Sequence, residues 1–359
     1  MRIISLFLIF LSNISFAKEI EIAVASMMHN LENESSIIFG DHVRKGIYLS
    51  LIHNKKLLDK LGLEIKLTEY NYTSETASIL EVAKKIQKSN AIAVHGYDYS
   101  SHALLSQHIH KDKDLSVVLP TATSDDIKEN ANNYFQIAGS NKSQAYAILE
   151  LLKKRNITKA SLIKRRSCAY CVDLSNQIET LAKEYNVKLD IILANNPKEL
   201  KQSENVYNLL PMYESEAIDF IKAISRDGKP RVYIGGDGWT SKGERYFKLL
   251  NDYNFKAICL AHWNQNTKDK SSKLFKQDYK SYFGSEASDV SALSYDSINF
   301  ILSALPHLKS YDRSSLKNYF SKRRTFLGIT GKHDFKENRK KGFVYLTWKQ
   351  NSFKVLDEI

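Results

Sequence analysis

Short apolar runs alternate along the chain with longer amphipathic stretches. We predict the short runs as strands at 20–25, 63–69, 91–94, 116–119, 160–163, 189–193, 206–210, 231–235 and 257–261. Between them, apolar residues recur every three or four positions, as on one face of a helix, at 41–58, 73–87, 143–152, 173–184 and 215–225. Strands that alternate with helices of this length form βαβ units, so we expect parallel sheets.

The alternation stops at residues 136–144 and then starts again, which indicates two similar α/β lobes rather than one long sheet. The length of 359 residues favours the same division, because a chain this long seldom folds around one small core. After Trp263 the chain is polar and helix-rich up to Leu308. It ends in two hairpin-like strands at 343–348 and 352–356.

The first residues have the pattern of a secretory signal peptide. Arg2 gives a positive start, and residues 3–11 form an apolar stretch that is too short to span a bilayer. Ser15 and Ala17 then fit the small-x-small cleavage rule, so we expect a signal peptide at 1–17. No cysteine lies at the cleavage point and no long apolar run follows. We therefore expect a soluble protein that is exported to the periplasm.

The formal net charge is +12, a property that nucleic-acid-binding proteins often have. The basic residues, however, are scattered through the predicted helices as lysine pairs, such as Lys55-Lys56 and Lys84-Lys85. No stripe of basic and aromatic residues accompanies them, so we expect no nucleic-acid partner.

The chain has 3 cysteines, of which two lie close together. In an oxidising compartment, Cys168 and Cys171 would form a disulfide or remain idle thiols, which leaves Cys259 odd. A redox-active CxxC is the alternative, but no thioredoxin-like pattern adjoins it. A zinc site would need further ligands nearby, and we interpret His108 and His110 as surface residues. We expect no metal and no cofactor.

Three predicted strands end in loops with polar side chains, and ligands of parallel α/β sheets gather at such ends. In "VHGYDYSSHAL", Ser100 and Ser101 stand where a helix should begin, and a helix N-terminus attracts anions. "LPTATSDD" brings Thr121 and Thr123 to the end of the next strand, and "YIGGDGW" brings Asp237 to the end of a strand in the second lobe. Each loop by itself is also an ordinary capping or turn sequence.

Taken in order, these loops resemble those of the type I periplasmic solute-binding proteins, in particular the branched-chain and other amino-acid receptors of ABC transporters. The resemblance covers nearly all of the mature chain and includes "FGDHVRKGIYLSL", "SALSYDSINFILSAL" and "FLGITGKHDFKENRKKGFVYLTW". It implies an α/β fold of two Rossmann-like lobes with parallel sheets, joined by a three-strand hinge. The implied boundaries are 18–139 with 265–327 for lobe one, and 140–264 with 328–359 for lobe two, with connections near 138–142, 262–266 and 325–331.

The resemblance also implies roles for the polar loop residues. Ser100 and Thr123 would bind the carboxylate of an amino-acid ligand, by hydroxyl and backbone N–H groups. Thr121 would offer its carbonyl to the ammonium group, and Asp237 would neutralise that ammonium.

Aromatic residues would close over the ligand. Tyr170 and Tyr213 fall at the positions of the family's closing tyrosines, and Phe39 at that of an aromatic which packs against the ligand side chain. Tyr170 is followed by Cys171 where the family has glycine, a departure that affects its local geometry. We expect an apolar or amide-binding wall made by Phe39, Tyr170, Tyr213, Trp239 and Val290. Arg165 and Arg166 would favour an acidic ligand instead if they faced the cleft; a solvated basic loop is the other interpretation.

The resulting hypothesis is a monomeric substrate-binding protein of an ABC transporter, with a permease of the inner membrane as partner. It would bind an amino acid or a similar small zwitterion by hinge closure. A sensing protein of the same fold is the first alternative. An enzyme is the second, with Asp98, Asp125, Asp126 and Asp237 as acid–base groups. We predict no catalytic residues, because the chain has no nucleophile elbow, P-loop or dinucleotide fingerprint.

Overall fold

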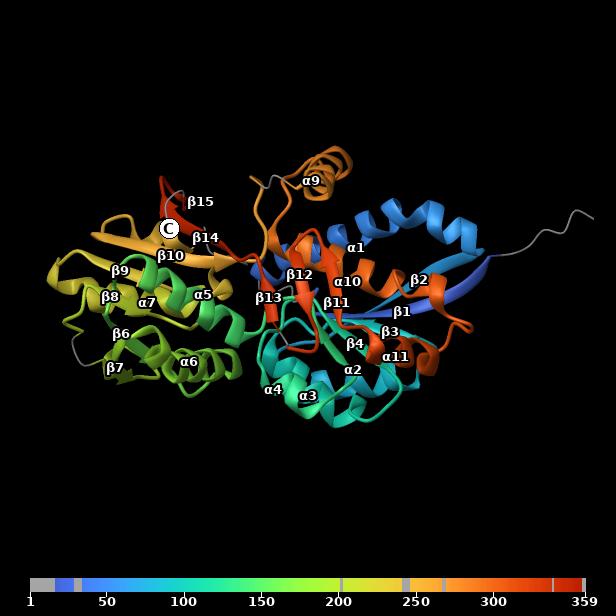
Figure 1. Ribbon diagram of the computed structural model, residues 1–359, viewed down its shortest axis with the longest axis horizontal. Coiled ribbons are helices and arrows are strands. Elements are labelled where there is room, and N and C mark those ends of the chain that lie inside the picture. The colour runs from blue at the N-terminus through green and yellow to red at the C-terminus, as the bar shows by residue number, and fades with distance from the viewer. Residues whose placement is uncertain are drawn as a thin grey trace, which may run out of the picture.

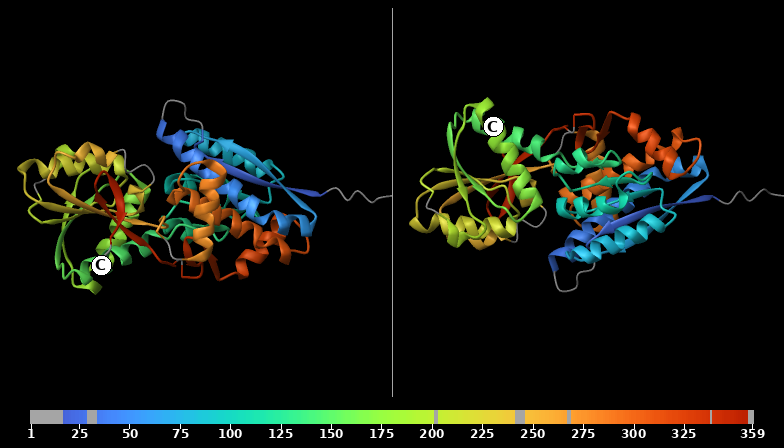
Figure 2. Two further views of the ribbon diagram at one scale, coloured as in Figure 1. Left: turned by 90° about the horizontal axis from the view of Figure 1, so that it is seen from above. Right: turned by 90° about the horizontal axis from the view of Figure 1, so that it is seen from below.

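The protein has two lobes that lie end to end in the computed structural model (Figures 1 and 2). The structure describes residues 17–28, 34–200, 203–240, 246–266, 269–337 and 339–356, so the predicted signal peptide lies outside them except for Ala17. Each lobe is built on a sheet of parallel strands with helices on its faces. The predicted α/β fold with parallel sheets in two lobes is confirmed.

Lobe one contains a five-stranded sheet in the order β2-β1-β3-β4-β5, in which every pair is parallel. Its strands are Lys18–Ser26 (β1), Leu63–Asn71 (β2), Ala93–His95 (β3), Ser116–Leu119 (β4) and Tyr134–Gln136 (β5). Alternate residues of β1 point to opposite faces of the sheet. Ile22 and Val24 join one core cluster, and Ala23 and Ala25 join another on the opposite face. Both faces are therefore buried, as the apolar strand sequences predicted.

Helices cover these two faces. They are Glu34–Leu61 (α1), Thr76–Lys88 (α2), Ser100–His110 (α3), Asp126–Asn130 (α4), Asp289–Leu302 (α10) and Arg313–Lys322 (α11). A further helix, Lys270–Phe283 (α9), packs on α1 and α10 rather than on the sheet. Residues of α2 and α3 belong to one core cluster, and residues of α1, α10 and α11 to the other. None of the helices in the described ranges has both the length and the apolar character needed to cross a membrane.

Lobe two contains a seven-stranded sheet in the order β15-β14-β10-β9-β8-β6-β7. Its strands are Lys159–Lys164 (β6), Lys188–Leu193 (β7), Tyr207–Leu209 (β8), Arg231–Ile234 (β9), Phe255–Ala261 (β10), Val344–Lys349 (β14) and Ser352–Val355 (β15). The covering helices are Asn141–Lys154 (α5), Ala169–Leu181 (α6) and Glu214–Ile224 (α7). The pair β14–β15 is the predicted C-terminal hairpin, and it extends the sheet antiparallel to β10.

A third, three-stranded sheet lies at the junction of the lobes and was not predicted from the sequence. It consists of Thr325–Gly328 (β11), Gly331–Asp334 (β12) and Arg339–Lys341 (β13). Phe335 packs on Phe135 and Phe300 of lobe one, whereas Phe343 packs against the core of lobe two. The third connection between the lobes therefore lies after Phe335, later than the expected 325–331, because this aromatic ring stays in the first core. The lobe boundaries as moving units remain a prediction.

Helices α1 and α10 pack closely at Gly46. A Cβ atom on this residue would lie 2.3 Å from the carbonyl oxygen of Ser291 in α10. We expect Gly46→Ala to lower the free energy of unfolding by about 1–3 kcal/mol, because the backbones would have to move apart. Urea unfolding measures this effect. Tyr48→Ala on an exposed part of the same helix is the control, and an equal effect of both changes would contradict the close contact.

Candidate functional site

One pocket between the lobes contains every residue that we selected as a ligand contact. Its lining includes Ser100, Thr121 and Thr123 from lobe one, Tyr170, Tyr213 and Asp237 from lobe two, and Phe39 from α1. These residues come from separate elements, and most follow directly after the carboxyl end of a strand. The cavity is small, about 50 Å³, so the two lobes lie nearly closed over it. That these lining residues bind a ligand remains a prediction.

The lobe-one side is formed by two strand-end loops that Ser100 ties together. The Ser100 hydroxyl accepts the backbone N–H groups of Thr123, at 3.2 Å, and of Ser124, at 3.1 Å. The Thr121 hydroxyl donates to the carbonyl oxygen of Asp98 at 2.6 Å. Ser100 therefore does more than cap a helix: it fixes the two loops relative to each other and presents the N-terminus of α3 to the pocket.

Asp98 attaches the first of these loops to the end of β1. Its carboxylate accepts the Ser26 hydroxyl, at 2.8 and 2.9 Å, and the Met27 N–H at 2.7 Å. The preceding loop passes close to β1 at Gly96, where φ is +123° and a Cβ atom would lie 2.0 Å from the Ala25 carbonyl oxygen. Only glycine fits there without strain. Asp98 is thus a structural carboxylate, since its oxygens bind the end of β1.

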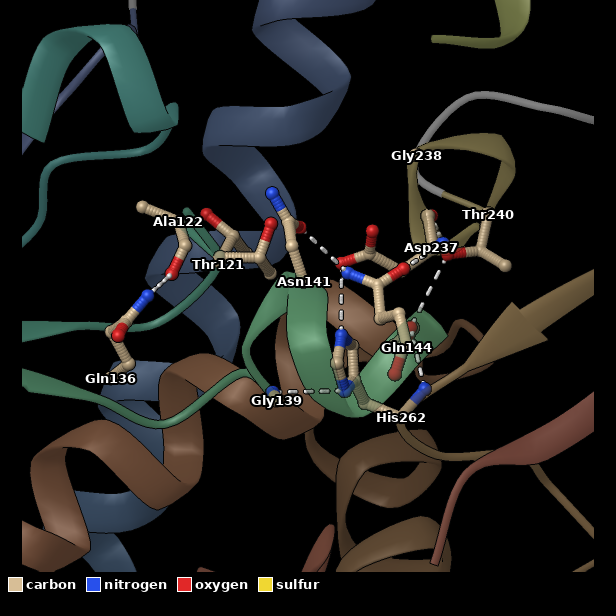
Figure 3. A network of polar contacts seen from close by, with 12 residues as sticks. Thr121, Ala122, Gln136, Gly139, Asn141, Gln144, Asp237, Gly238, Thr240 and His262 are labelled. Carbon is tan, nitrogen blue, oxygen red and sulfur yellow. Dashed lines mark hydrogen bonds and ion pairs between the residues drawn. The ribbon is translucent and has the colours of Figure 1, made fainter. Parts of the chain in front are cut away.

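On the lobe-two side, Asp237 is held by two side chains, one from α5 and one from the residue that follows β10. Its N–H donates to Gln144 Oε1 at 2.9 Å, and its Oδ2 lies 2.9 Å from His262 Nε2 (Figure 3). The other ring nitrogen of His262, Nδ1, accepts the Gly139 N–H at 3.5 Å. Because Nδ1 accepts, Nε2 carries the proton and donates it to Asp237. The pair joins β9 to two of the connections between the lobes.

A second carboxylate, Asp289, lies beside this pair. Its Oδ2 accepts the backbone N–H of His262 at 3.1 Å and the Thr240 hydroxyl at 3.2 Å. Among the described residues, neither lysine nor arginine lines the pocket. Arg165 instead forms an ion pair with Glu216, which argues against the interpretation that it selects an acidic ligand.

Aromatic rings connect the lobes across the pocket. Tyr170 and Tyr213 stack with their centroids 5.0 Å apart, and Tyr213 meets Tyr99 of lobe one edge-to-face at 5.6 Å. Tyr99 in turn stacks on Phe39 at 6.2 Å. Burial and the neighbouring Asp237 carboxylate raise the pKa of Tyr170 well above its usual value, so its phenol keeps its proton and can donate it.

The family comparison identifies residues 49–349 as a "Receptor family ligand binding region". The chain belongs to this receptor family. The suspected relation to type I periplasmic binding proteins is thereby confirmed, and this is a family of binding proteins rather than of enzymes. A search of curated proteins gives no match.

Solved structures of ABC-transporter binding proteins have the same fold as this receptor-family chain. A leucine binding protein from Thermotoga maritima is 20% identical, with a TM-score of 0.80 over 94% of this chain and 97% of that chain. A branched-chain amino acid transporter substrate binding protein from Streptococcus pneumoniae, in complex with isoleucine, is 19% identical, with a TM-score of 0.75 over 94% and 99%. A solute binding protein from R. palustris, in complex with benzoate, is 13% identical, with a TM-score of 0.75 over 94% and 95%.

We expected Val290 and Trp239 to belong to the apolar wall of this receptor-family pocket. Val290 lines the pocket, but Trp239 does not. Trp239 is fully buried in the core of lobe two, where its indole N–H donates to the Met212 carbonyl at 3.0 Å and its ring lies 5.0 Å from Phe247. The expectation for Trp239 was wrong, because the short helix Asp237–Trp239 turns the aspartate toward the cleft and the indole away from it.

Several lining residues escaped the sequence analysis, among them His262, Asp289 and Tyr99. His262 directly follows β10 in "LAHW", a strand end that we had not searched for polar side chains. Asp289 begins α10 and Tyr99 precedes α3, where both resemble ordinary helix-start residues. Only the position of His262 after a predicted strand could have signalled its role.

The cysteines agree with the expected pairing. Cys168 and Cys171 form a disulfide across the first turn of α6, with Cα atoms 5.1 Å apart, and Cys259 is a buried free thiol. The disulfide encloses Tyr170 and so lies next to the pocket. No cluster of three or more metal-binding side chains occurs in the described part of the chain.

Proposed function

We propose that the protein is an extracytoplasmic substrate-binding protein of an ABC transporter, which binds an amino acid or a similar small zwitterion between its lobes. One observation carries the proposal. The pocket has two different ends. One end consists of hydroxyls and a helix N-terminus around Ser100 and Thr123, and the other carries the Asp237 carboxylate. These two ends match the two charges of a zwitterion.

At the lobe-one end, a ligand carboxylate would meet the N-terminus of α3 and the hydroxyls of Ser100 and Thr123. In the closed pocket the Thr123 N–H donates to Ser100, so the hydroxyls and the helix N-terminus supply the remaining donors. This set of donors differs from the one expected from the sequence, in which the Thr123 N–H donates to the ligand carboxylate directly.

At the lobe-two end, a ligand ammonium would meet Asp237. His262 donates to one carboxylate oxygen, which fixes the orientation of Asp237. Asp289 adds a carboxylate beside it, and within the described ranges of the chain no lysine or arginine that would repel an ammonium lines the pocket. Tyr170 and Tyr213 close over the ligand and exclude water, which strengthens both polar contacts.

The similar structures support a role in uptake, since they are binding proteins of ABC transporters whose ligands include leucine, isoleucine and benzoate. We infer that the signal peptide directs this chain to the periplasm. There it would act as a monomer that delivers its ligand to a permease in the inner membrane.

A thermal-shift screen against amino acids, their amides and simple carboxylates tests the proposal. We expect an α-amino acid to raise the melting temperature, with about 2.7 kcal/mol of stabilisation at a hundred times its dissociation constant. Simple carboxylates without an amine should give no comparable shift. A response to carboxylates alone, or to no compound with an α-amino group, would contradict the assignment.

A further inference from the structure

A second and larger cavity lies in lobe one, along the free edge of strand β5. It is formed by α4, by β5, by the end of α11 and by residues 335–336, and its volume is about 620 Å³. β5 pairs only with β4, so its other edge faces this space. None of its lining residues belongs to the ligand pocket between the lobes. We propose that this cavity is a binding site for a small organic anion with an apolar body.

Positive charge is the first property that points to an anion. Five cationic side chains line the cavity: Lys128, Lys322, Arg323, Arg324 and Lys336. No acidic residue of the described ranges lines it. A concave surface with charges of one sign concentrates ligands of the opposite sign. This charge contrasts with that of the pocket between the lobes, which has carboxylates and no lysine or arginine.

Lys128 is the cation least satisfied by the protein itself. Its Nζ is shielded from solvent and has no hydrogen-bond partner among the described residues. Burial lowers the pKa of Lys128, while the carboxylates of Asp334 and Asp125 act in the opposite direction. A shielded ammonium that donates no hydrogen bond is unfavourable. The flexible Lys128 side chain has to turn its Nζ toward the cavity to reach an anion there, which would then stabilise the ammonium.

Arg323, by contrast, has a structural role. Its guanidinium donates to the Ser303 hydroxyl at 2.6 Å and to the Thr325 carbonyl at 3.2 Å, and it lies over the Phe300 ring at 5.2 Å. The side chain of Arg324 is exposed and has no comparable contact among the described residues. Lys322 and Lys336 are exposed as well, so every cation of the lining except Arg323 remains for a ligand. Lys128 and Arg324 are the two that we select for replacement.

Gln136 leaves an unsatisfied hydrogen-bond acceptor in the wall of the cavity. Its side chain is only 5% exposed, and its Nε2 donates to the carbonyls of Ala122, at 3.2 Å, and Ser124, at 3.0 Å (Figure 3). Its Oε1 is buried and has no partner in the described part of the chain. Since this oxygen can only accept, a ligand with an O–H or N–H donor as well as its charge would satisfy it once a shift of the wall exposes the oxygen. Gln136 also supports the loop that carries Thr121 and Thr123.

Three aromatic rings give the cavity an apolar floor. Phe135 lies 5.1 Å from Phe320 and 5.9 Å from Phe335, measured between ring centroids, and all three line the cavity. An inorganic ion has no apolar surface that it could bury against these rings. An organic anion with a flat apolar body would cover it while its charged groups reach the cations.

Calorimetric titration with 5-hydroxyisophthalate tests the site, because this probe combines a ring, two carboxylates and a hydroxyl donor. We expect saturable binding of one molecule that weakens with added salt. Isophthalate, which lacks the hydroxyl, and inorganic phosphate, which lacks the ring, should each bind at least several-fold more weakly. Equal affinity for all three would overturn the assignment of the acceptor and the apolar floor.

Variants locate the probe. Lys128→Met removes the charge of the side chain and keeps its apolar stem. Lys128→Met and Arg324→Met should each raise the dissociation constant of the probe about tenfold. Lys128→Arg should restore most of the affinity. The exposed Lys84→Met is the matched control and should have no effect. Binding that both lining variants leave unchanged, or that Lys84→Met weakens equally, would refute the site. So would a loss in Asp237→Asn, since the probe would then occupy the pocket between the lobes.

Discussion

Replacement of Asp237 by asparagine should weaken the binding of an α-amino acid by about 30-fold or more. Closure of the lobes removes water from the ligand ammonium, which then needs a charged partner. A buried charge that loses its partner typically costs about 2–5 kcal/mol. The asparagine side chain would keep the shape and could still accept the proton of His262, so the unliganded protein should melt nearly unchanged. Calorimetric titration of wild type and Asp237→Asn measures the effect.

Two further variants control this experiment. Asp219→Asn makes the same chemical change at an exposed position of α7 in the same lobe and should leave affinity unchanged. Ser100→Ala should cost less than Asp237→Asn, because the N-terminus of α3 and the freed Thr123 N–H remain available to the ligand carboxylate. If Asp237→Asn binds an α-amino acid as tightly as wild type, the site assignment is wrong and Asp237 does not hold the ligand ammonium.

Acidification below about pH 6.5 should destabilise the protein, because three buried histidines resist protonation. Burial lowers the pKa of His95 to about 3, and the pKa values of His102 and His110 to about 4. In the unfolded chain these residues titrate near about 6.5. Below about pH 6.5 the unfolded state binds protons that the folded state does not bind. The contribution of these histidines to the free energy of unfolding is therefore complete above that pH and is lost as the pH falls toward about 4. Each histidine contributes about 1.4 kcal/mol per pH unit, or about 4 kcal/mol for the three.

Urea unfolding at a series of pH values between about 7.5 and about 4.5 tests this effect. His95→Asn should reduce the slope of stability against pH by about a third, whereas His307→Asn, at an exposed position, should leave it unchanged. A stability that stays constant over this range would show that the three imidazoles are not buried in their neutral form. His110 also corrects a prediction: it is fully buried and bonded to Tyr97 and Gln87, whereas we had expected a surface residue.

The sequence alone predicted the two lobes, most of their strands and about half of the residues that line the pocket. It could do so because each of these features has a local cause. Apolar runs such as 116–119 are strands because both faces of their sheet are covered, and Ser100, Thr123 and Asp237 each follow a strand directly. In parallel sheets the carboxyl ends of the strands meet, so such residues converge without any knowledge of the packing. Strand β5, only 3 residues long, and the sheet β11–β13 were missed because neither leaves a periodic signal.

Only the tertiary structure decided which side chains complete the site. His262 and Asp289 lie 27 positions apart and become neighbours because the second connection between the lobes passes the start of α10. Trp239, two residues after Asp237, faces the core instead, because the buried indole N–H finds its acceptor at Met212. The cavity at β5 likewise depends on segments as distant as Lys128 and Lys336. Local patterns determine elements and strand ends, but contacts between distant segments depend on how the lobes and helices pack, which no short stretch of sequence encodes.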